Sequence, residues 1–326
     1  MDPFGKVRLG RTGPIVTRLG LGTAPLGGWP EAVSDNDVVS TVRTCLDAGV
    51  RYLDTAPYYG YGQAEQRIGV ALRDLSISDL VVSTKVGRVL RPGASPNPLY
   101  KGAPPLTAEF DFSYESTLRS LEESRSRLGL DHIDIAYIHD PDDDHHEEAL
   151  RGAFRALRDL RAAGHLSAIG VGMGHSGPLA RFAKEGDFDC FMVAGRYTLL
   201  DQSALDDLLP EALNVGASVV AGGVFNSGIL ANPIGSPYYD YERASEQVIA
   251  RAKHLEEICR GYEVPLRAAA LQFPLAHPAV AAIVVGARSA HEAQDNIDNL
   301  QVAIPTELWA QLRREGLISE DVPIPA

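Results

Sequence analysis

Residues 52–65 read YLDTAPYYGYGQAE and carry the signals of three consecutive structural elements. Tyr52–Thr55 is a short run of the kind that forms a buried strand. Residues 56–62 combine proline, glycine and tyrosine and predict a loop, and from Gln63 onward apolar residues recur at helical spacing. The stretch therefore predicts one strand–loop–helix unit of an α/β protein.

The same unit recurs along the chain, because short runs rich in Val, Ile and Ala alternate with longer segments of helical period. The predicted strands are Leu19–Thr23, Tyr52–Thr55, Leu80–Thr84, Ile133–Ile138, Ala168–Gly172, Cys190–Ala194, Ser218–Ala221 and Ala282–Val285. The predicted outer helices include Asp37–Ala48, Gln63–Leu75, Phe112–Leu128, Glu147–Ala163, Gly177–Lys184 and Gln202–Val215. Eight such repeats predict a (β/α)₈ TIM barrel, with residues 1–326 forming a single domain.

Two regions depart from the repeat. Val7–Leu9 and Val16–Arg18 flank a glycine-containing turn and predict an N-terminal β-hairpin that could plug the barrel floor. Late in the chain the spacing between strands lengthens, and the Gly/Pro/Tyr-rich segment Phe225–Tyr241 precedes helices predicted at Ser245–Tyr262 and Leu266–Leu275. A long loop in that position is expected to overhang the C-terminal face of the barrel.

The overall composition narrows the possible partners. The formal net charge is −13 and the sequence pI is about 5.1, so we expect no binding to nucleic acid. No apolar run is long enough for a membrane span, and the N-terminus lacks a signal-peptide pattern. Cys45, Cys190 and Cys259 are widely separated and odd in number, which favours core thiols in a cytoplasmic protein. The oligomeric state is left open.

Polar residues follow three neighbouring strands of the predicted barrel. Asp54 and Tyr59 follow the second strand, Lys85 ends the third and His139 ends the fourth. The carboxyl ends of barrel strands meet at one face, where active sites lie, so these four side chains are expected to converge. A chance arrangement of helix caps and solvated strand ends explains them less well.

The four residues suit proton transfer coupled to hydride transfer. A tyrosine hydroxyl has a pKa of about 10 and needs tuning to exchange protons near neutrality. Lys85 is expected to stabilise the Tyr59 phenolate, Asp54 to orient Lys85, and His139 to hydrogen-bond the substrate oxygen. The set therefore predicts interconversion of a carbonyl and an alcohol, with the hydride carried by a nicotinamide cofactor.

At this point the sequence resembles the aldo-keto reductases. The pattern Asp-Thr-Ala-x-x-Tyr-Gly-x-Gly-x-x-Glu occupies residues 54–65. Further matching blocks are Thr84-Lys85, Ile138-His139-Asp140-Pro141, Gly20-Leu21-Gly22-Thr23, Ile169-Gly170-Val171, Gly286-Ala287-Arg288-Ser289 and Asn296. The resemblance extends across nearly the whole chain, and it implies that Asp54, Tyr59, Lys85 and His139 are the catalytic residues.

The resemblance also implies NAD or NADP bound across the C-terminal face without a Rossmann fingerprint. It places Thr23, Asp54, Gly172 and Met173 beside the nicotinamide half of the cofactor. The pyrophosphate loop would comprise Phe225, Asn226, Ser227, Gly228 and Leu230, and the adenosine end Gly286, Ala287, Arg288, Ser289 and Asn296. Arg288 could hold a 2′-phosphate, but Glu292 would repel it, so the sequence favours NAD with use of both left open.

Two departures from the common family pattern point to a branch of the family. Gly172-Met173 replaces the frequent Ser-Asn pair, and Ala194 stands where a glutamine often grips the nicotinamide. With these features the chain resembles the branch of D-threo-aldose (L-fucose) 1-dehydrogenase, L-galactose dehydrogenase and pyridoxal 4-dehydrogenase. The resemblance implies oxidation of the anomeric carbon of a small aldose to a lactone. Pyridoxal oxidation, general aldehyde or ketone reduction, and a nicotinamide-binding regulatory subunit remain alternatives.

Two remaining features concern ligands. Trp29 lies in the first βα loop, and together with Tyr59 and His139 it is a candidate substrate contact, although plain loop packing explains it equally well. The run from Asp142 to Glu148 contains two histidines and five acidic residues and could bind a metal. It stands where a helix begins, however, and acidic side chains are favoured there by the helix dipole. We therefore predict no metal site.

Overall fold

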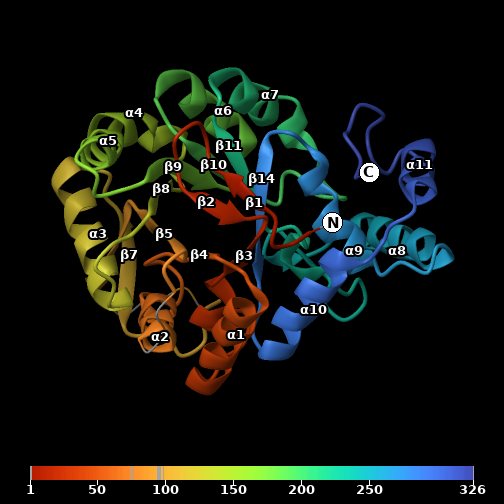
Figure 1. The fold of residues 1–326 in the computed structure, drawn as a ribbon, viewed down its shortest axis with the longest axis horizontal. Coiled ribbons are helices and arrows are strands. Elements are labelled where there is room, and N and C mark those ends of the chain that lie inside the picture. Colours follow the sequence, from red (N-terminus) through yellow and green to blue (C-terminus); the bar gives the residue numbers. More distant parts are fainter. Residues whose placement is uncertain (1, 74, 76, 94–96, 98, 326) are drawn as a thin grey trace.

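A computed structural model describes residues 2–73, 75, 77–93, 97 and 99–325, and it shows eight parallel strands closed into a barrel (Figure 1). The strands are β3 (Leu19–Gly22), β4 (Tyr52–Asp54), β5 (Val81–Val86), β8 (Ile135–His139), β9 (Ala168–Met173), β10 (Cys190–Ala194), β11 (Ser218–Gly222) and β14 (Val280–Gly286). Each strand pairs with the next in chain order, and β14 closes the barrel by pairing with β3. The predicted (β/α)₈ barrel is confirmed, with each strand within two residues of its predicted bounds.

Helices surround the barrel on its outside (Figure 1). They are α1 (Asp35–Ala48), α2 (Gln63–Leu72), α3 (Tyr114–Leu128), α4 (His146–Ala149), α5 (Arg155–Ala162), α6 (Ser176–Glu185), α7 (Leu208–Val215), α8 (Glu246–Gly261), α9 (Leu266–Gln272), α10 (Ala290–Gln301) and α11 (Thr306–Arg314). Helix α1 shows how their ends are fixed, since the Ser34 hydroxyl accepts a hydrogen bond from the Asp37 amide and Gly49 ends the helix in a left-handed conformation.

Two predicted helices differ in the structure. The continuous helix predicted over Glu147–Ala163 is divided into α4, a π-helical segment (Leu150–Phe154) and α5. The helix predicted from Gln202 begins only at Leu208, after a separate 3₁₀ turn at Ser203–Leu205. The apolar spacing persists through both segments, so periodicity alone does not reveal these local changes of backbone hydrogen bonding.

The N-terminal hairpin closes one end of the barrel. Strands β1 (Lys6–Arg8) and β2 (Ile15–Thr17) pair antiparallel. Leu9 and Val16 are fully buried and pack with Tyr52, Tyr137 and other side chains of the barrel interior. The hairpin therefore plugs the barrel floor, as the sequence predicted.

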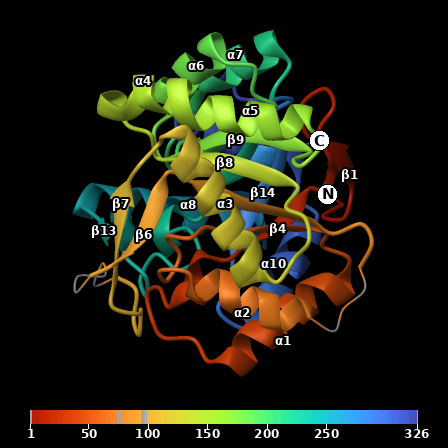
Figure 2. The ribbon, with the colours of Figure 1, turned by 90° about the vertical axis from the view of Figure 1, so that its left-hand side faces the viewer.

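The opposite end of the barrel carries two further hairpins. These are β6 (Arg88–Pro92) with β7 (Leu106–Phe110), and β12 (Tyr238–Tyr239) with β13 (Glu242–Arg243). Figure 2 shows β6, β7 and β13 at the end away from β1. The second hairpin lies in the long loop region expected over the mouth, whereas the β6–β7 hairpin was not anticipated from the sequence.

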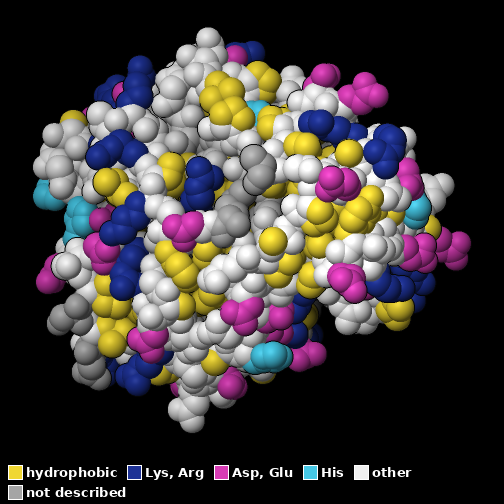
Figure 3. All heavy atoms as spheres, turned by 45° about the vertical axis from the view of Figure 1, so that its right-hand side comes forward, with side chains coloured by type: hydrophobic (Ala, Val, Ile, Leu, Met, Phe, Trp, Pro, Cys, Tyr) yellow, Lys and Arg dark blue, Asp and Glu magenta, His cyan; other side chains and the backbone are white. Residues whose placement is uncertain are grey.

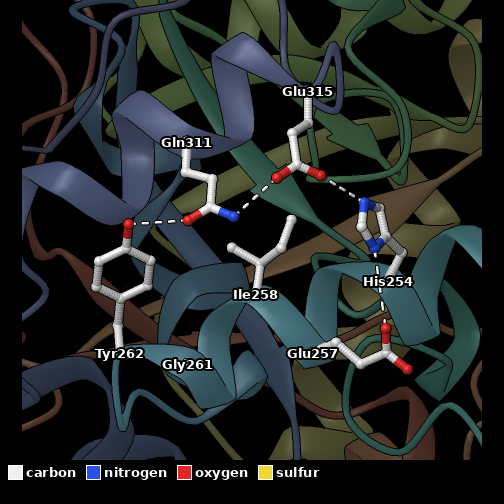
Figure 4. Close-up of a pocket in the computed structure, with 7 residues that line it drawn as sticks. All are labelled: His254, Glu257, Ile258, Gly261, Tyr262, Gln311 and Glu315. Atoms are coloured by element: carbon white, nitrogen blue, oxygen red, sulfur yellow. Dashed lines mark hydrogen bonds and ion pairs between the residues drawn. The ribbon is translucent and has the colours of Figure 1, made fainter.

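On the face shown in Figure 3, acidic and basic side chains are interspersed and apolar ones form small groups. A groove between α8 and α11, outside the barrel wall, is lined by residues that already pair with one another (Figure 4). Glu315 lies 2.6 Å from His254 Nε2 and accepts a hydrogen bond from Gln311, which in turn accepts one from Tyr262. Across the part of the chain described, the helices are too short or too polar to cross a membrane.

Candidate active site

Three adjacent strands bring the predicted catalytic residues to the barrel mouth. Asp54 ends β4, Lys85 lies near the end of β5 and His139 ends β8, while Tyr59 follows in the loop that leads into α2. The pairing of β4 with β5 and of β5 with β8 sets these residues side by side. Asp54 and Lys85 are each 2% exposed and His139 is 7% exposed. The structure thus brings all four residues together at one face.

The ion pair between Lys85 and Asp54 is held by several hydrogen bonds. Lys85 Nζ lies 2.6 Å from Asp54 Oδ2 and donates a second hydrogen bond of 2.9 Å to the Thr55 carbonyl. The Ser83 hydroxyl donates to the other Asp54 oxygen at 2.7 Å. A buried ion pair is tolerated only when its remaining hydrogen-bonding capacity is used in this way. The ammonium group is consequently held in one position.

Tyr59 lies directly beside this pair, and Lys85 Nζ stands 4.6 Å from the centre of its ring. Burial of the phenol, followed by the negative charge of Asp54, raises the pKa of Tyr59 well above its usual value. The net shift is therefore opposite to the lowering that the sequence analysis expected. Asp54 offsets the field of the Lys85 ammonium, and the positive charge of Arg88 also lowers the Tyr59 pKa.

The surroundings of His139 favour its uncharged imidazole form. Burial, and then the positive charges of Arg88 and Lys85, lower the pKa of His139 well below its usual value. Its ring stands edge-on to Tyr59 with the centroids 6.0 Å apart. Its Nδ1 atom is buried and has no hydrogen-bond partner among the residues that the structure describes. A neutral imidazole can both donate and accept hydrogen bonds, which suits contact with a substrate oxygen.

Two charged residues of the mouth were missed as functional candidates. Arg88 Nη2 lies 2.6 Å from Asp140 Oδ2, and its guanidinium carbon stands 4.4 Å from the centre of the Tyr58 ring. The same Asp140 oxygen lies 3.6 Å from His139 Nε2. Their sequence positions gave a signal, because Arg88 follows Lys85 by three residues and Asp140 follows His139 directly.

Aromatic side chains form the walls around this polar centre. Tyr58 packs edge-on against both Tyr100 and His139, at centroid distances of 5.7 and 6.2 Å. On another side Trp29 meets Tyr241 edge-on at 5.3 Å, which joins the first βα loop to the long late loop. Trp29 therefore lies at the mouth, but this contact is equally compatible with loop packing and with substrate binding.

The late loop is tied down over the mouth by several bonds. Arg196 makes two hydrogen bonds to the Asp240 carboxylate, of 2.8 and 3.1 Å, and another to the Gly174 carbonyl. The Tyr241 amide donates to the Ser227 hydroxyl at 2.9 Å. These contacts fix the segment that contains the predicted pyrophosphate residues next to the ends of β9 and β10.

Two features of the mouth bear on whether it can bind a nicotinamide cofactor: buried polar atoms without partners, and open space beside glycines. Thr23 Oγ1 and Asn226 Oδ1 are buried and find no hydrogen-bond partner among the described residues. At Gly222, and less freely at Gly172, a methyl group would enter space that no protein atom fills closely. Buried polar atoms without partners are rare in proteins, so these oxygens mark places for ligand contact. The residues at the mouth therefore fit a nicotinamide cofactor.

Three of the predicted cofactor residues have their side chains in the apolar core. Met173, Leu230 and Ala287 are at most 5% exposed, and their side chains pack in the main apolar cluster. Alternation along β9 directs the Gly172 position toward the barrel interior and Met173 toward the helices. These three residues could therefore contact a ligand only through their backbone.

The predicted adenosine-end residues lie together at the start of α10. Ser289 caps this helix through its hydroxyl, and Asn296 donates a hydrogen bond to the Gly286 carbonyl. Arg288 Nη2 lies 2.7 Å from Glu292 Oε1, and the Arg288 amide also donates to this carboxylate. Burial favours the neutral acid, but the bonds and charge from Arg288 outweigh it and hold the pKa of Glu292 below its usual value.

The acidic and histidine-rich run does not converge on one point. Asp142 caps the following 3₁₀ turn by accepting a hydrogen bond from the His145 amide. His146 instead points inward, where it stacks on Phe182 and pairs with Glu185 at 2.7 Å. The side chains of the run thus serve capping and packing within the part of the chain described.

Comparisons with known proteins agree with this geometry. The family model described as "Aldo/keto reductase family" matches residues 18–315. The chain belongs to the aldo/keto reductase family, and its fold and oxidoreductase class follow from that membership.

Three relatives narrow the comparison. The chain is 44% identical to a pyridoxal 4-dehydrogenase of Microbacterium luteolum, over 96% of this chain and 98% of that protein. It is 40% identical to a D-threo-aldose 1-dehydrogenase of a Pseudomonas species, over 94% and 96%. It is 30% identical to L-galactose dehydrogenase of Arabidopsis thaliana, over 96% and 91%. The resemblance to this branch of the family is thereby confirmed.

A solved structure supports the fold. The holo form of the aldo-keto reductase AKR11C1 from Bacillus halodurans superimposes with a TM-score of 0.77 at 24% identity, covering 97% of both chains. At this level of identity the likeness concerns the arrangement of the barrel and its helices.

Proposed function

We propose that the protein oxidises the anomeric carbon of a small aldose, of the L-fucose or L-galactose type, to its lactone with NAD(P) as hydride acceptor. The observation that carries the proposal is the convergence of Tyr59, Lys85, Asp54 and His139 at one barrel mouth. Support also comes from two relatives that are named as sugar dehydrogenases. The general class of chemistry, oxidoreduction of a small molecule, belongs to the family as a whole.

Each side chain has a distinct role in this proposal. Tyr59 accepts the proton of the anomeric hydroxyl during oxidation and returns it during reduction. Lys85 and Asp54 fix the position and charge around the phenol, while neutral His139 hydrogen-bonds the anomeric oxygen and so orients the reacting carbon. When bound, the nicotinamide supplies hydride acceptance. The surrounding tyrosines limit the access of water.

The cofactor is proposed to lie across the mouth from Thr23 to α10. Unsatisfied oxygens of Thr23 and Asn226 and the open space at Gly222 support contact with its nicotinamide half and pyrophosphate. Asp54 and Gly172 belong to the same region, followed by Phe225–Leu230, Gly286–Ser289 and Asn296 toward the adenosine. NAD is favoured over NADP because the Glu292 carboxylate occupies Arg288 and would repel a 2′-phosphate.

Pyridoxal is the second candidate substrate, because it also forms a cyclic hemiacetal. The relative that is 44% identical is named pyridoxal 4-dehydrogenase. The edge-on rings of Tyr58, Tyr100 and Trp29 offer flat apolar surfaces that suit an aromatic ring as well as a sugar face. Trp29 is accordingly retained as a proposed substrate contact beside Tyr59 and His139.

The proposal is tested by following nucleotide reduction at 340 nm with L-fucose, L-galactose and pyridoxal, each with NAD and NADP, and by identifying the lactone product. Aldose oxidation that exceeds pyridoxal oxidation in kcat/KM supports the main proposal. The reverse order replaces it with pyridoxal oxidation. Reduction of simple aldehydes alone would indicate a general reductase, and tight nucleotide binding without turnover would indicate a regulatory subunit.

The three cysteines support a proposal for the cellular setting. All three cysteines are buried free thiols, with the pKa of Cys45, Cys190 and Cys259 raised to about 12 by burial. Such thiols are inert core residues, as the sequence predicted. We propose a cytoplasmic enzyme that acts on a small molecule.

A further inference from the structure

The charged pair Arg88–Asp140 stands next to the proposed reaction centre but has no part in the proton transfer. Its side chains are 21% and 34% exposed, so it is neither a core ion pair nor a freely solvated one. Arg88 is held in place between the rings of Tyr58 and Phe110, at 4.4 and 4.9 Å. Such packing fixes the guanidinium and reduces the entropy lost when it binds a further group.

Both partners keep hydrogen-bonding capacity that the described part of the chain does not use. Arg88 Nη2 donates a hydrogen bond of 2.6 Å to Asp140 Oδ2. None of the described residues accepts a bond from Arg88 Nη1 or donates one to Asp140 Oδ1. A donor and an acceptor therefore stand side by side at the mouth, as a hydroxyl group requires.

The position of the pair relative to His139 shows which hydroxyl it can reach. Asp140 Oδ2 lies 3.6 Å from His139 Nε2, so a group bound by Asp140 neighbours the oxygen that His139 would bind. In a cyclic aldose the anomeric oxygen is flanked by the ring oxygen and by the 2-hydroxyl. A carboxylate accepts hydrogen bonds only, and the ring oxygen has no hydrogen to donate. The 2-hydroxyl is the group that satisfies both partners.

We propose that Arg88 and Asp140 form a specificity site that binds the hydroxyl on the carbon next to the oxidised one, with Arg88 donating to its oxygen and Asp140 accepting its hydrogen. This inference rests on the proposed function and names the substrate class within it as a neutral 2-hydroxy hemiacetal. The phenolate of pyridoxal has no hydrogen to give to Asp140, so the pair discriminates against it.

The specificity site is tested by comparing two substrates in three forms of the enzyme. The unmodified enzyme, Arg88→Met and Asp140→Asn are assayed with L-galactose and with 2-deoxy-L-galactose. Asparagine is chosen because Asp140 has a φ of 48°, which asparagine tolerates and alanine does not. We expect the unmodified enzyme to prefer L-galactose by about 10- to 100-fold in kcat/KM and each variant to reduce that preference to within about threefold.

Several controls separate a direct contact from a structural effect. Arg91→Met changes another arginine of β6, which is 41% exposed and pairs with Glu109 and Asp111, and it should leave the preference intact. L-Galactose and L-fucose differ only at the remote 6-position, so the ratio of kcat/KM for L-galactose to that for L-fucose should be the same in all variants as in the unmodified enzyme. Arg88 lowers and Asp140 raises the pKa of Tyr59, so the two variants should displace the pH profile in opposite directions.

The outcomes distinguish this inference from the proposed function. A preference for L-galactose over its 2-deoxy form that survives both substitutions overturns the specificity site, even if aldose oxidation is efficient. Binding of both sugars to the protein–NADH complex is measured in parallel by calorimetry, with the same cycle applied to Kd. Oxidation of pyridoxal without any binding of aldoses would overturn the specificity site while leaving hemiacetal oxidation in place. If Arg88→Met is unstable by thermal melting, Arg88→Leu, which also lacks a donor, replaces it.

Discussion

At the scale of single residues, Tyr59 carries the chemistry through one oxygen atom. Tyr59→Phe keeps the ring that packs against His139 and below Lys85, and removes only the phenol. We expect kcat for aldose oxidation to fall by at least about 100-fold while Kd for NAD changes less than about threefold. Steady-state assays and nucleotide fluorescence titration measure the two quantities. Turnover near that of the unmodified enzyme would show that another group moves the proton.

The raised pKa of Tyr59 has a consequence for the direction of catalysis. Oxidation needs the phenolate, whose population grows as pH rises toward a pKa that burial and Asp54 hold well above the usual value. We expect kcat/KM for oxidation to climb through the range pH 7–9, at about tenfold per unit where proton transfer limits the rate. Reduction needs the neutral phenol and should stay nearly flat over that range. An oxidation profile that levels off below pH 7 would contradict this assignment.

Glu292 is the residue on which the cofactor preference depends. In Glu292→Gln the negative charge is lost and the bonds that hold Arg288 weaken, so Arg288 becomes available to a 2′-phosphate. We expect the ratio of kcat/KM for NADP to that for NAD to rise about tenfold. Glu31→Gln is the control, because Glu31 is 79% exposed and stands 3.7 Å from the same arginine. An equal change in both variants would point to general surface charge.

The sequence predicted which residues meet at the mouth better than how they influence one another. Asp54, Tyr59, Lys85 and His139 follow strand ends, and strand ends share one face of a barrel. The net shift of the Tyr59 pKa was predicted in the wrong direction, because burial of the phenol and the Asp54 carboxylate, which pairs with Lys85 at 2.6 Å, raise it. Distances of this kind are set by side-chain packing between strands and cannot be derived from spacing along the chain.

At the scale of elements, the loop containing β12 and β13 is fastened by the pair between Arg196 and Asp240. Asp240→Asn retains the left-handed backbone conformation, at a φ of 50°, but removes the charge. Since Asp240 is 45% exposed, the pair contributes modestly, and we expect KM for NAD and the rate of nucleotide release to rise about two- to fivefold. Stopped-flow release of NADH measures the rate, and high salt should reduce the difference. An unchanged release rate would show that the loop does not retain the cofactor.

The elements that sequence patterns predicted are those with a strong apolar period. The eight barrel strands are buried on both faces and read as apolar runs, whereas β6 and β7 lie at the mouth and contain exposed and half-buried positions. The π-helical segment Leu150–Phe154 keeps the spacing of an ordinary helix. Elements whose form depends on neighbours rather than on their own periodicity were therefore missed, and one of them supplies Arg88.

At the scale of the whole molecule, stabilising apolar contacts and the proposed catalytic residues lie at opposite ends of the barrel. The hairpin β1–β2 buries apolar side chains at the floor, whereas the Lys85–Asp54 ion pair and the unpartnered oxygens of Thr23 and Asn226 lie at the mouth. Figure 2 shows these two ends facing opposite directions. Barrel enzymes in general place catalytic loops at the C-terminal face and stabilising contacts at the other. A change at the floor should consequently alter unfolding without altering the kinetics.

Leu9 and Ile15 on the N-terminal plug allow that separation to be measured. Leu9 is fully buried in the interior cluster, so Leu9→Ala should lower the free energy of unfolding by about 3 kcal/mol and reduce Tm by several degrees. Ile15 is 47% exposed on the same hairpin, and Ile15→Ala should change Tm little. Below the transition, kcat and KM of both variants should match the unmodified enzyme, because the mouth does not rest on the hairpin. A Leu9→Ala enzyme that is stable but catalytically impaired would show that the floor and the mouth are coupled through the barrel interior.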